Sequence, residues 1–440
     1  MTTADVRVPH ARWFVIGSAV TVCAVILWLT RTYTFYFDEW DFILSFPDWQ
    51  FGSYFQPHNE HLVLIPRLAY AGLFVTAGLR TYLPYMAALL FLHAANALLL
   101  FEIVRRRQGD LIGLAAAALL LLIGAGWEDL LWAFQIAFVG AVTCGLACLL
   151  VLTSVRSSRG VLLAVLLLAG AVMFSGIGLF LGVAVAVRLA LDPARRRDLL
   201  WFAPVAIAFV VWELTFGRIG APPVPPAGAG NLLALPRYVA WGLGAGAGGI
   251  IGVTNWPFVA LVVALAAVAL TWWRSRPDPL ALGIAAGLFA FYAVTGLTRA
   301  QLGYQQSGAG RYIYIGAVFW LILLADAAAT LPWRGTWRPA LVACLFLACF
   351  NSGVLLVSYS AAKTVQMQRQ WADLQALSAV RNDSCLDPFG AVDPLVMPWV
   401  TRPAAYYRAV DRYGIPAAGF PIADSADYEA ALKQLRKAGC

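Results

Sequence analysis

Long apolar runs, separated by short clusters of arginine, are the feature that most constrains how this chain can fold. Runs such as LIGLAAAALLLLIGAG, VLLAVLLLAGAVMF and PFVALVVALAAVAL approach the roughly 20 residues that a helix needs to cross a hydrocarbon layer of about 30 Å. Hydrophobic residues make up 61% of the chain and charged residues 12%, with a mean hydropathy of +0.74. Soluble domains carry about twice that share of charge. The sequence therefore predicts an all-α polytopic membrane protein.

The arginine clusters predict a topology if all of them are placed on the cytoplasmic side. The net charge of +8 is concentrated in these clusters, so nucleic-acid binding is not indicated. The expected topology has about eleven transmembrane helices, begins inside and leaves the C-terminus outside. The expected spans are residues 13–31, 83–104, 111–126, 130–154, 161–174, 178–191, 199–216, 257–273, 279–298, 312–331 and 338–358.

The apolar run HLVLIPRLAYAGLFVTAGL is not counted as a span. A crossing there would move Arg105, Arg106 and Arg107 to the outer side, against the positive-inside pattern. Pro66 and Arg67 near its start favour a helix that lies at the membrane interface. A long first external loop is therefore expected over residues 32–82, with two interfacial helices.

Two domains are expected. Residues 1–360 form a transmembrane domain, and the more polar residues 361–440 form a small external C-terminal domain. Of the seven cysteines, only Cys385 and Cys440 would face an oxidising exterior. A disulfide between them and two free thiols are both left open. His93 lies alone in an apolar run and is expected to be a hydrogen-bonded core residue.

Polar side chains that could act on a ligand gather in the loops expected to lie outside. Three acids stand among aromatic residues in FYFDEWDF, directly after the first span, and other acids, imidazoles and arginines come from loops far apart in sequence. Convergence of such loops on one face would build a site on the membrane scaffold. The candidate residues are Asp38, Glu39, Asp41, His58, Glu60, His61, Arg67, Glu128, Asp129, Arg299 and Arg311.

This layout resembles the GT-C superfamily of integral-membrane glycosyltransferases, in particular protein O-mannosyltransferases and lipid A aminoarabinose transferases. The resemblance is carried by an external F-D-E at residues 37–39 and by a long first loop whose second interfacial helix begins with a His motif. It covers residues 10–200 in layout. The chain has QPHNEHLVLIPRL where similar enzymes commonly have H-P-P-L or K-P-P-L. The SGIGL break at residues 175–179 and the pair Arg311 and Tyr312 also resemble features of that superfamily.

The resemblance implies an inverting hexosyl- or pentosyltransferase that takes its sugar from a polyprenyl phosphate. The acceptor would be a glycan, lipid or protein hydroxyl of the cell envelope. The enzyme would be a multi-pass protein of the bacterial cytoplasmic membrane, in contact with membrane lipids and not with nucleic acid. Its active site would face the periplasm or exterior.

Asp38 matches the position of the catalytic acid in that superfamily and is expected to be the general base. A hydroxyl is a poor nucleophile, so a positioned carboxylate has to take its proton during attack on the anomeric carbon. Glu39 is expected to orient Asp38 or the acceptor. Asp41, Glu60, Glu128 and Asp129 are expected to bind the acceptor or to support these groups, and for Glu128 and Asp129 simple hydration of a loop is an equal alternative.

Cations are expected near the donor phosphate, because charge develops on the leaving group. Arg311 and Arg299 could grip phosphate oxygens bidentately, and Arg67 is a third candidate. His58 and His61 are expected to hydrogen-bond the phosphate or the sugar.

Two alternatives to these assignments remain open. The H-x-E-H motif lacks the i, i+4 spacing of a helical zinc pair, so no metal site is predicted, although a divalent cation is left open. A transporter or flippase of lipid-linked glycans, or a polymerase or ligase of such glycans, is the alternative function. A transporter often shows internal repeats or charges in mid-membrane, and neither is evident in the sequence.

Overall fold

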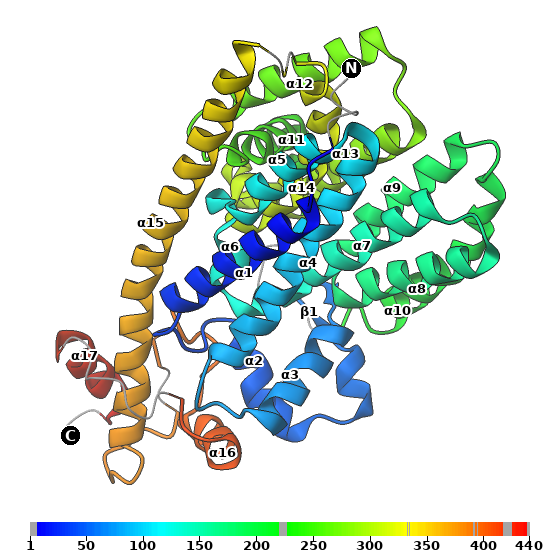
Figure 1. Cartoon of the computed structure of the whole chain (residues 1–440). Coiled ribbons are helices and arrows are strands. Elements are labelled where there is room, and N and C mark those ends of the chain that lie inside the picture. The colour runs from blue at the N-terminus through cyan, green and yellow to red at the C-terminus, as the bar shows by residue number, and fades with distance from the viewer. Residues whose placement is uncertain are drawn as a thin grey trace.

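The computed structural model describes residues 7–219, 227–331, 333, 335–389, 392–393, 395–416 and 425–437. Within these residues the regular secondary structure is helical apart from one short β-hairpin and an isolated bridge between Leu386 and Arg436. Figure 1 shows long helices packed side by side, with the smaller helices gathered at one end. The fold is all-α and polytopic, as predicted.

Eight helices of the described chain, some counted with an adjoining 3₁₀ turn, are long and apolar enough to cross a membrane, and they coincide with eight of the predicted spans. The other three predicted spans are helices of 12, 17 and 14 residues, which are short for a crossing. The eight are α1 (Ala11–Leu29), α4 (Leu83–Gln108), α7 (Ile136–Ser154), α10 (Leu199–Thr215), α12 (Pro257–Arg274), α13 (Pro279–Arg299), α14 (Gly310–Ala328) and α15 (Trp337–Ala379). The three shorter helices are α5 (Asp110–Leu121), α8 (Ser158–Phe174) and α9 (Gly178–Leu191).

The outer helices carry large apolar side chains on exposed faces. Trp13 on α1, Leu200 on α10, Val262 on α12 and Phe346 on α15 are each more than 60% exposed. Apolar faces of this extent are unfavourable in water and are typical of helices that contact lipid. The protein is therefore embedded in a membrane.

The two ends of the helix array differ in chemistry. At one end, called the arginine end here, Arg107 forms ion pairs with Asp278 and Asp326, and Arg12 pairs with Glu102. At the other, called the loop end, lie the first loop and the C-terminal helices α16 (Pro403–Tyr413) and α17 (Ser425–Leu435). This separation agrees with the sorting of charge that the sequence predicts.

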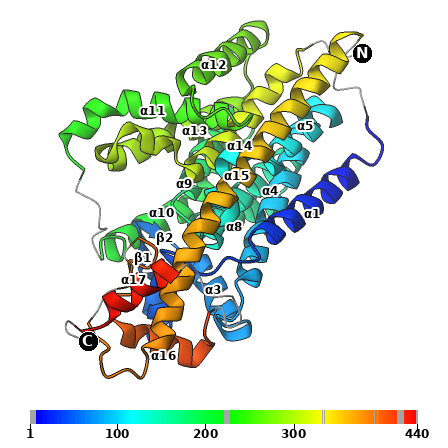
Figure 2. The same cartoon turned by 90° about the vertical axis from the view of Figure 1, so that its left-hand side faces the viewer.

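Helix α15 connects the two ends. It has 43 residues and therefore measures about 65 Å at 1.5 Å per residue, roughly twice the thickness of a hydrocarbon layer of about 30 Å. Figures 1 and 2 show it running along the whole height of the molecule. The predicted domain boundary at residue 360 falls inside this helix, so the transmembrane and C-terminal parts share one continuous element.

The first loop holds two helices, α2 (Glu39–Ser45) and α3 (Leu64–Thr76), joined by two short 3₁₀ turns and a hairpin. The hairpin pairs β1 (Pro57–His58) with β2 (His61–Leu62). The prediction that the His motif begins the second helix is wrong, because α3 starts only at Leu64. Asn59 and Glu60 have φ of 47° and 69°, as the tightest hairpin turns require.

His93 is hydrogen-bonded in the core, as expected. Its Nδ1 lies 3.0 Å from Tyr314 Oη and its Nε2 lies 3.3 Å from the Leu121 carbonyl oxygen. Asn96, one turn further along α4, donates to the same tyrosine hydroxyl and to the Val139 carbonyl. This network joins α4, α5, α7 and α14 inside the helix array.

Helix α11 (Ala229–Gly249) lies between two of the expected spans, was not predicted as a helix and ends in a glycine-rich stretch. A Cβ atom added at Gly246 would lie 3.0 Å from Tyr292 Oη and 3.3 Å from Gly316 Cα. Trp320 Nε1 also donates to the Leu243 carbonyl oxygen. The absence of side chains therefore lets α11 approach α13 and α14 closely.

We expect Gly246→Leu to lower the free energy of unfolding by about 1–3 kcal/mol, because the added carbons overlap the backbone of α14. Gly17→Leu on α1 is the matched control, since nothing lies within 4 Å of a Cβ at that position. Thermal unfolding of both purified variants in detergent measures the difference. Equal stability of the two variants would contradict this account of the packing.

Candidate functional site

Asp38 lies at the first turn of α2 and receives hydrogen bonds from two distant parts of the chain. Its carboxylate accepts from Trp399 Nε1 through Oδ1 and from Asn59 Nδ2 through Oδ2, each at 3.2 Å. The residue is only 8% exposed. One donor belongs to the hairpin turn and the other to the C-terminal segment, so the carboxylate is fixed in orientation at the junction of the two.

His58 lies between two of the predicted acids. Its Nδ1 is 3.0 Å from Asp41 Oδ2 and its Nε2 is 3.7 Å from Asp38 Oδ2. Burial lowers the pKa of His58, but the hydrogen bonds and charges of Asp38 and Asp41 outweigh it, so the pKa is raised overall. His58 thus lies against both carboxylates, one at each ring nitrogen.

Unusual backbone conformations cluster around these acids. Four described residues other than glycine have positive φ, and three of them, Phe37, Asn59 and Glu60, flank Asp38 or form the hairpin turn beside it. Such conformations cost about 1–3 kcal/mol each and persist only where tertiary contacts hold them. Here the Phe37 amide donates to the Val396 carbonyl oxygen at 3.0 Å. Strain concentrated in this way is typical of functional sites.

Glu39 points into the protein interior. It is fully buried, and its carboxylate accepts from the hydroxyls of Tyr70 and Tyr82 and from the Tyr36 amide, at 2.7–3.1 Å. Burial raises the pKa of Glu39 to about 7, against the lowering effect of these hydrogen bonds. The contacts favour the expected orienting role: Glu39 anchors the helix whose first turn presents Asp38.

The two predicted donor-side arginines pair with two predicted acids. Arg311 Nη1 lies 2.9 Å from Glu128 Oε2, and Arg299 Nη2 lies 3.2 Å from Glu60 Oε2. A Cβ at Gly310 would meet Glu128 at 3.2 Å, so α14 begins in close contact with α6 (Glu128–Leu131). The structure thus brings residues from three separate loops together at the loop end.

His61 lies beside these arginines. Burial, Arg299, His58 and Arg311 together lower its pKa to about 3, so the imidazole is neutral at physiological pH. A Cβ at Gly176 would lie 2.7 Å from His61 Nδ1. The SGIGL break between α8 and α9 therefore packs against the hairpin.

Two further predicted residues are enclosed by protein. Asp129 is fully buried with neither carboxyl oxygen hydrogen-bonded, and burial followed by the charge of Glu128 raises its pKa well above the ordinary value. The Arg67 guanidinium lies over the rings of Phe42 and Trp49, at 4.6 and 5.0 Å from their centroids. This stacking accounts for Arg67 without a ligand.

Lys363 is a residue that the sequence analysis missed. It is 4% exposed, and its Nζ lies 3.0 Å from the centroid of Tyr36 and 5.9 Å from that of Trp132. It has no hydrogen bond or ion pair within the described part of the chain. The only sequence signal was its rarity, because the chain has three lysines against many arginines.

Tyr36 connects the acids of the first loop with the ion-paired residues that include Glu128. Burial raises its pKa, and the charges of Glu128 and Asp38 add to the effect, so both acids lie near it. Its ring also stacks on Phe37 and meets the edge of Trp132. The acids of the first loop and the paired arginines therefore flank one aromatic cluster that carries a buried lysine.

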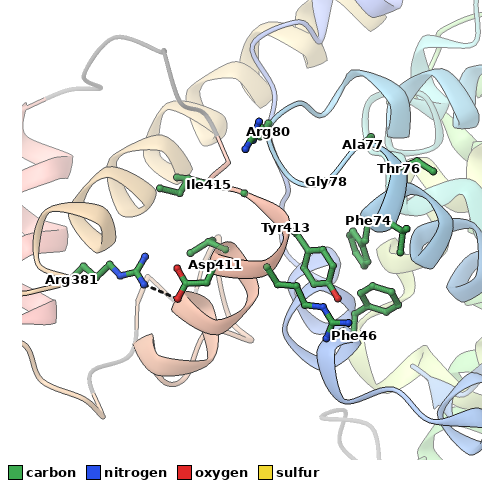
Figure 3. A pocket seen from close by; sticks show the side chains of 14 residues that line it. Phe46, Phe74, Thr76, Ala77, Gly78, Arg80, Arg381, Asp411, Tyr413 and Ile415 are labelled. Atoms are coloured by element: carbon green, nitrogen blue, oxygen red, sulfur yellow. Dashed lines mark hydrogen bonds and ion pairs between the residues drawn. The ribbon is translucent and has the colours of Figure 1, made fainter.

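Two cavities stand out, and neither contains Asp38. A groove of about 940 Å³ at the loop end is lined by Phe46, Phe74, Arg80 and Tyr413 among others (Figure 3). A cavity of about 460 Å³ lies at the arginine end, around Arg107. Asp38 lies outside both cavities, is 8% exposed and accepts a hydrogen bond from Trp399.

The sequence left open both a divalent cation and a disulfide between Cys385 and Cys440. Among the residues described, no group of three or more His, Cys, Asp or Glu side chains is arranged to hold a metal ion. Cys385 is disulfide-bonded, whereas the five cysteines from Cys23 to Cys349 are free. Cys440 lies outside the described residues.

Comparison with known proteins finds no matching family model, no matching curated protein and no matching solved structure. The fold and site therefore define the protein as an all-α polytopic membrane protein with a buried polar site at one end.

We expect Glu39→Ala to lower the free energy of unfolding by about 3 kcal/mol, because three buried donors lose their acceptor. Glu39→Gln should cost only about 1 kcal/mol, since its amide oxygen still accepts. Thermal unfolding in detergent measures both, with the exposed Glu429→Ala as control. A Glu39→Ala variant as stable as the control would show that the carboxylate anchors nothing.

The raised pKa of Glu39 also predicts that the stability of the protein depends on pH. Its folded pKa of about 7 exceeds the ordinary value of 4.5, so between these values the folded state binds more protons than the unfolded state. The stability of the wild type relative to Glu39→Gln should therefore fall as pH rises from about 4.5 to about 7, by at most about 3 kcal/mol, and stay level above. Parallel pH curves for the two proteins would contradict this.

Proposed function

We propose that this protein is an inverting glycosyltransferase of the bacterial cytoplasmic membrane. It moves a sugar from a polyprenyl phosphate to a hydroxyl of a cell-envelope glycan, lipid or protein, on the outer face. The single observation that carries the proposal is Asp38: a carboxylate at the loop end, oriented by two donors and flanked by strained backbone. The GT-C-like order of the first span, the F-D-E motif and the long first loop supports it.

The chemistry requires one base and one stabilised leaving group. The acceptor oxygen attacks the anomeric carbon while its proton passes to the Asp38 carboxylate. The bond between that carbon and the phosphate oxygen breaks, and the electron pair leaves with the polyprenyl phosphate. Attack opposite the leaving group inverts the configuration. Glu39 and His58 contribute by positioning Asp38 rather than by touching the sugar.

Cations at the loop end suit the leaving phosphate. Arg299 and Arg311 each use part of the guanidinium on an acid, and a guanidinium has five N–H donors in all, so donors remain for phosphate oxygens. Lys363 adds a buried amino group without a hydrogen-bonding partner among the described residues, and neutral His61 adds a further donor. Such preorganised donors are most effective where water is excluded, as around Tyr36 and Trp132.

Asp38→Asn is expected to lower sugar transfer by about a hundredfold or more, the usual contribution of a positioned base. Membranes containing wild type or variant are given a panel of polyprenyl-phosphate sugars with cell-envelope extract as acceptor, and release of polyprenyl phosphate is measured. Asp48→Asn is the matched control, because Asp48 is exposed and pairs with Arg408 instead of facing the site.

The outcomes separate the functional classes. Consumption of one donor by wild type and by Asp48→Asn, but not by Asp38→Asn, supports the transferase and its base. Equal turnover by all three proteins removes Asp38 as the base. If no donor is consumed, the transferase proposal fails, and a transporter, flippase, polymerase or ligase of lipid-linked glycans becomes the better explanation.

A further inference from the structure

The groove at the loop end joins the first loop to the C-terminal segment. The Leu79 amide donates to the Tyr413 carbonyl oxygen at 2.8 Å, and a Cβ at Gly414 would meet Arg80 Cγ at 2.8 Å. The rings of Phe46, Phe74 and Tyr413 pack together beside this contact, with centroids 5.0–6.0 Å apart. Figure 3 shows these side chains around one open space.

The groove carries an excess of positive charge. Three arginines and one aspartate line it, and only Arg381 is neutralised, by Asp411 at 2.7 Å. Arg80 and Arg412 form no ion pair with any described residue, although both are exposed. Two unneutralised guanidiniums at one groove are complementary to an anion, and phosphate oxygens suit their fork of donors.

The position of the groove favours a lipid over a soluble ligand. Arg80 lies three residues before Leu83, where the long apolar helix α4 begins, so the groove lies at the depth of lipid headgroups. Val75 is 74% exposed and Ile415 is 43% exposed, and both line the groove. An apolar rim in a groove with two unneutralised guanidiniums matches a molecule that has an anionic headgroup and acyl chains.

We infer that this groove binds the headgroup of an anionic phospholipid of the outer leaflet. The phosphate contacts Arg80 and Arg412, and the glycerol and acyl carbons contact Val75 and Ile415. The site is independent of the proposed sugar transfer. Because the groove unites α3 with α16, a bound lipid ties the C-terminal segment, which carries Trp399, to the first loop, which carries Asp38.

The test compares phosphatidylglycerol with phosphatidylcholine of identical acyl chains, titrated onto the purified full-length chain and detected by native mass spectrometry. Wild type should prefer phosphatidylglycerol about tenfold, since each basic residue near a membrane surface adds a modest attraction to an anionic lipid. The double variant Arg80→Gln/Arg412→Gln should lose this preference. Its binding of phosphatidylcholine and its unfolding temperature report whether it is folded.

The matched control is Arg31→Gln/Arg218→Gln, which removes the same charge from two exposed arginines outside the groove. It should keep the wild-type preference. An equal loss in the control would show a general surface effect and overturn the inference, as would a preference that survives in the groove variant. Binding of a soluble uronic-acid oligosaccharide in place of phosphatidylglycerol, lost in the groove variant, would make the groove a glycan site and overturn it too.

Discussion

The buried carboxylate of Glu39 is the contact on which the site depends most. A carboxylate removed from water needs hydrogen bonds to offset its desolvation, and Glu39 obtains them from Tyr36, Tyr70 and Tyr82. Tyr82 also accepts from the Ala133 amide at 2.8 Å. One acid thereby ties α2 to α3, to the residues before α4 and to the turn before α7.

Asp38, the neighbour of Glu39 in the sequence, is positioned by it. Successive residues at the start of a helix point in different directions, so Glu39 and its neighbour Asp38, the N-cap residue of α2, reach different partners. Asp38 then needs only the two donors from Asn59 and Trp399 to become fixed. The two acids of the F-D-E motif thus differ in their contacts: Glu39 binds groups of the first loop and of the residues before α4, whereas Asp38 binds the hairpin turn and the C-terminal segment.

Much of the fold follows from the sequence because apolar length and arginine clustering are local signals. The long helices and the two helices of the first loop lie where these signals put them. The hairpin was missed because Asn59-Glu60 lacks the glycine that usually marks such a turn. Helix α11 was missed because its glycines reduce helix propensity, while tertiary packing against α13 and α14 stabilises it.

The sequence predicted which types of residue form the site, but it did not predict which acid pairs with which arginine. Acids and arginines in external loops suggested convergence, but the pairs Arg299 with Glu60 and Arg311 with Glu128 join residues 239 and 183 positions apart. No local pattern encodes such distances. Trp399 and Lys363 were missed for the same reason, since each contacts a residue of the first loop, Asp38 and Tyr36 respectively, that is far away in sequence.

Several residues that contact Asp38 and its neighbours are synthesised long after Asp38 itself. Trp399 is synthesised 361 residues after Asp38. Tyr33, just before Asp38, bonds to Ser360 on the last long helix. During membrane insertion Asp38 therefore lacks its hydrogen-bond donor Trp399 until α15 and the segment after it have been synthesised. Lys363, which lies on α15 against Tyr36, is also absent until then. A partly inserted chain therefore does not have a complete site.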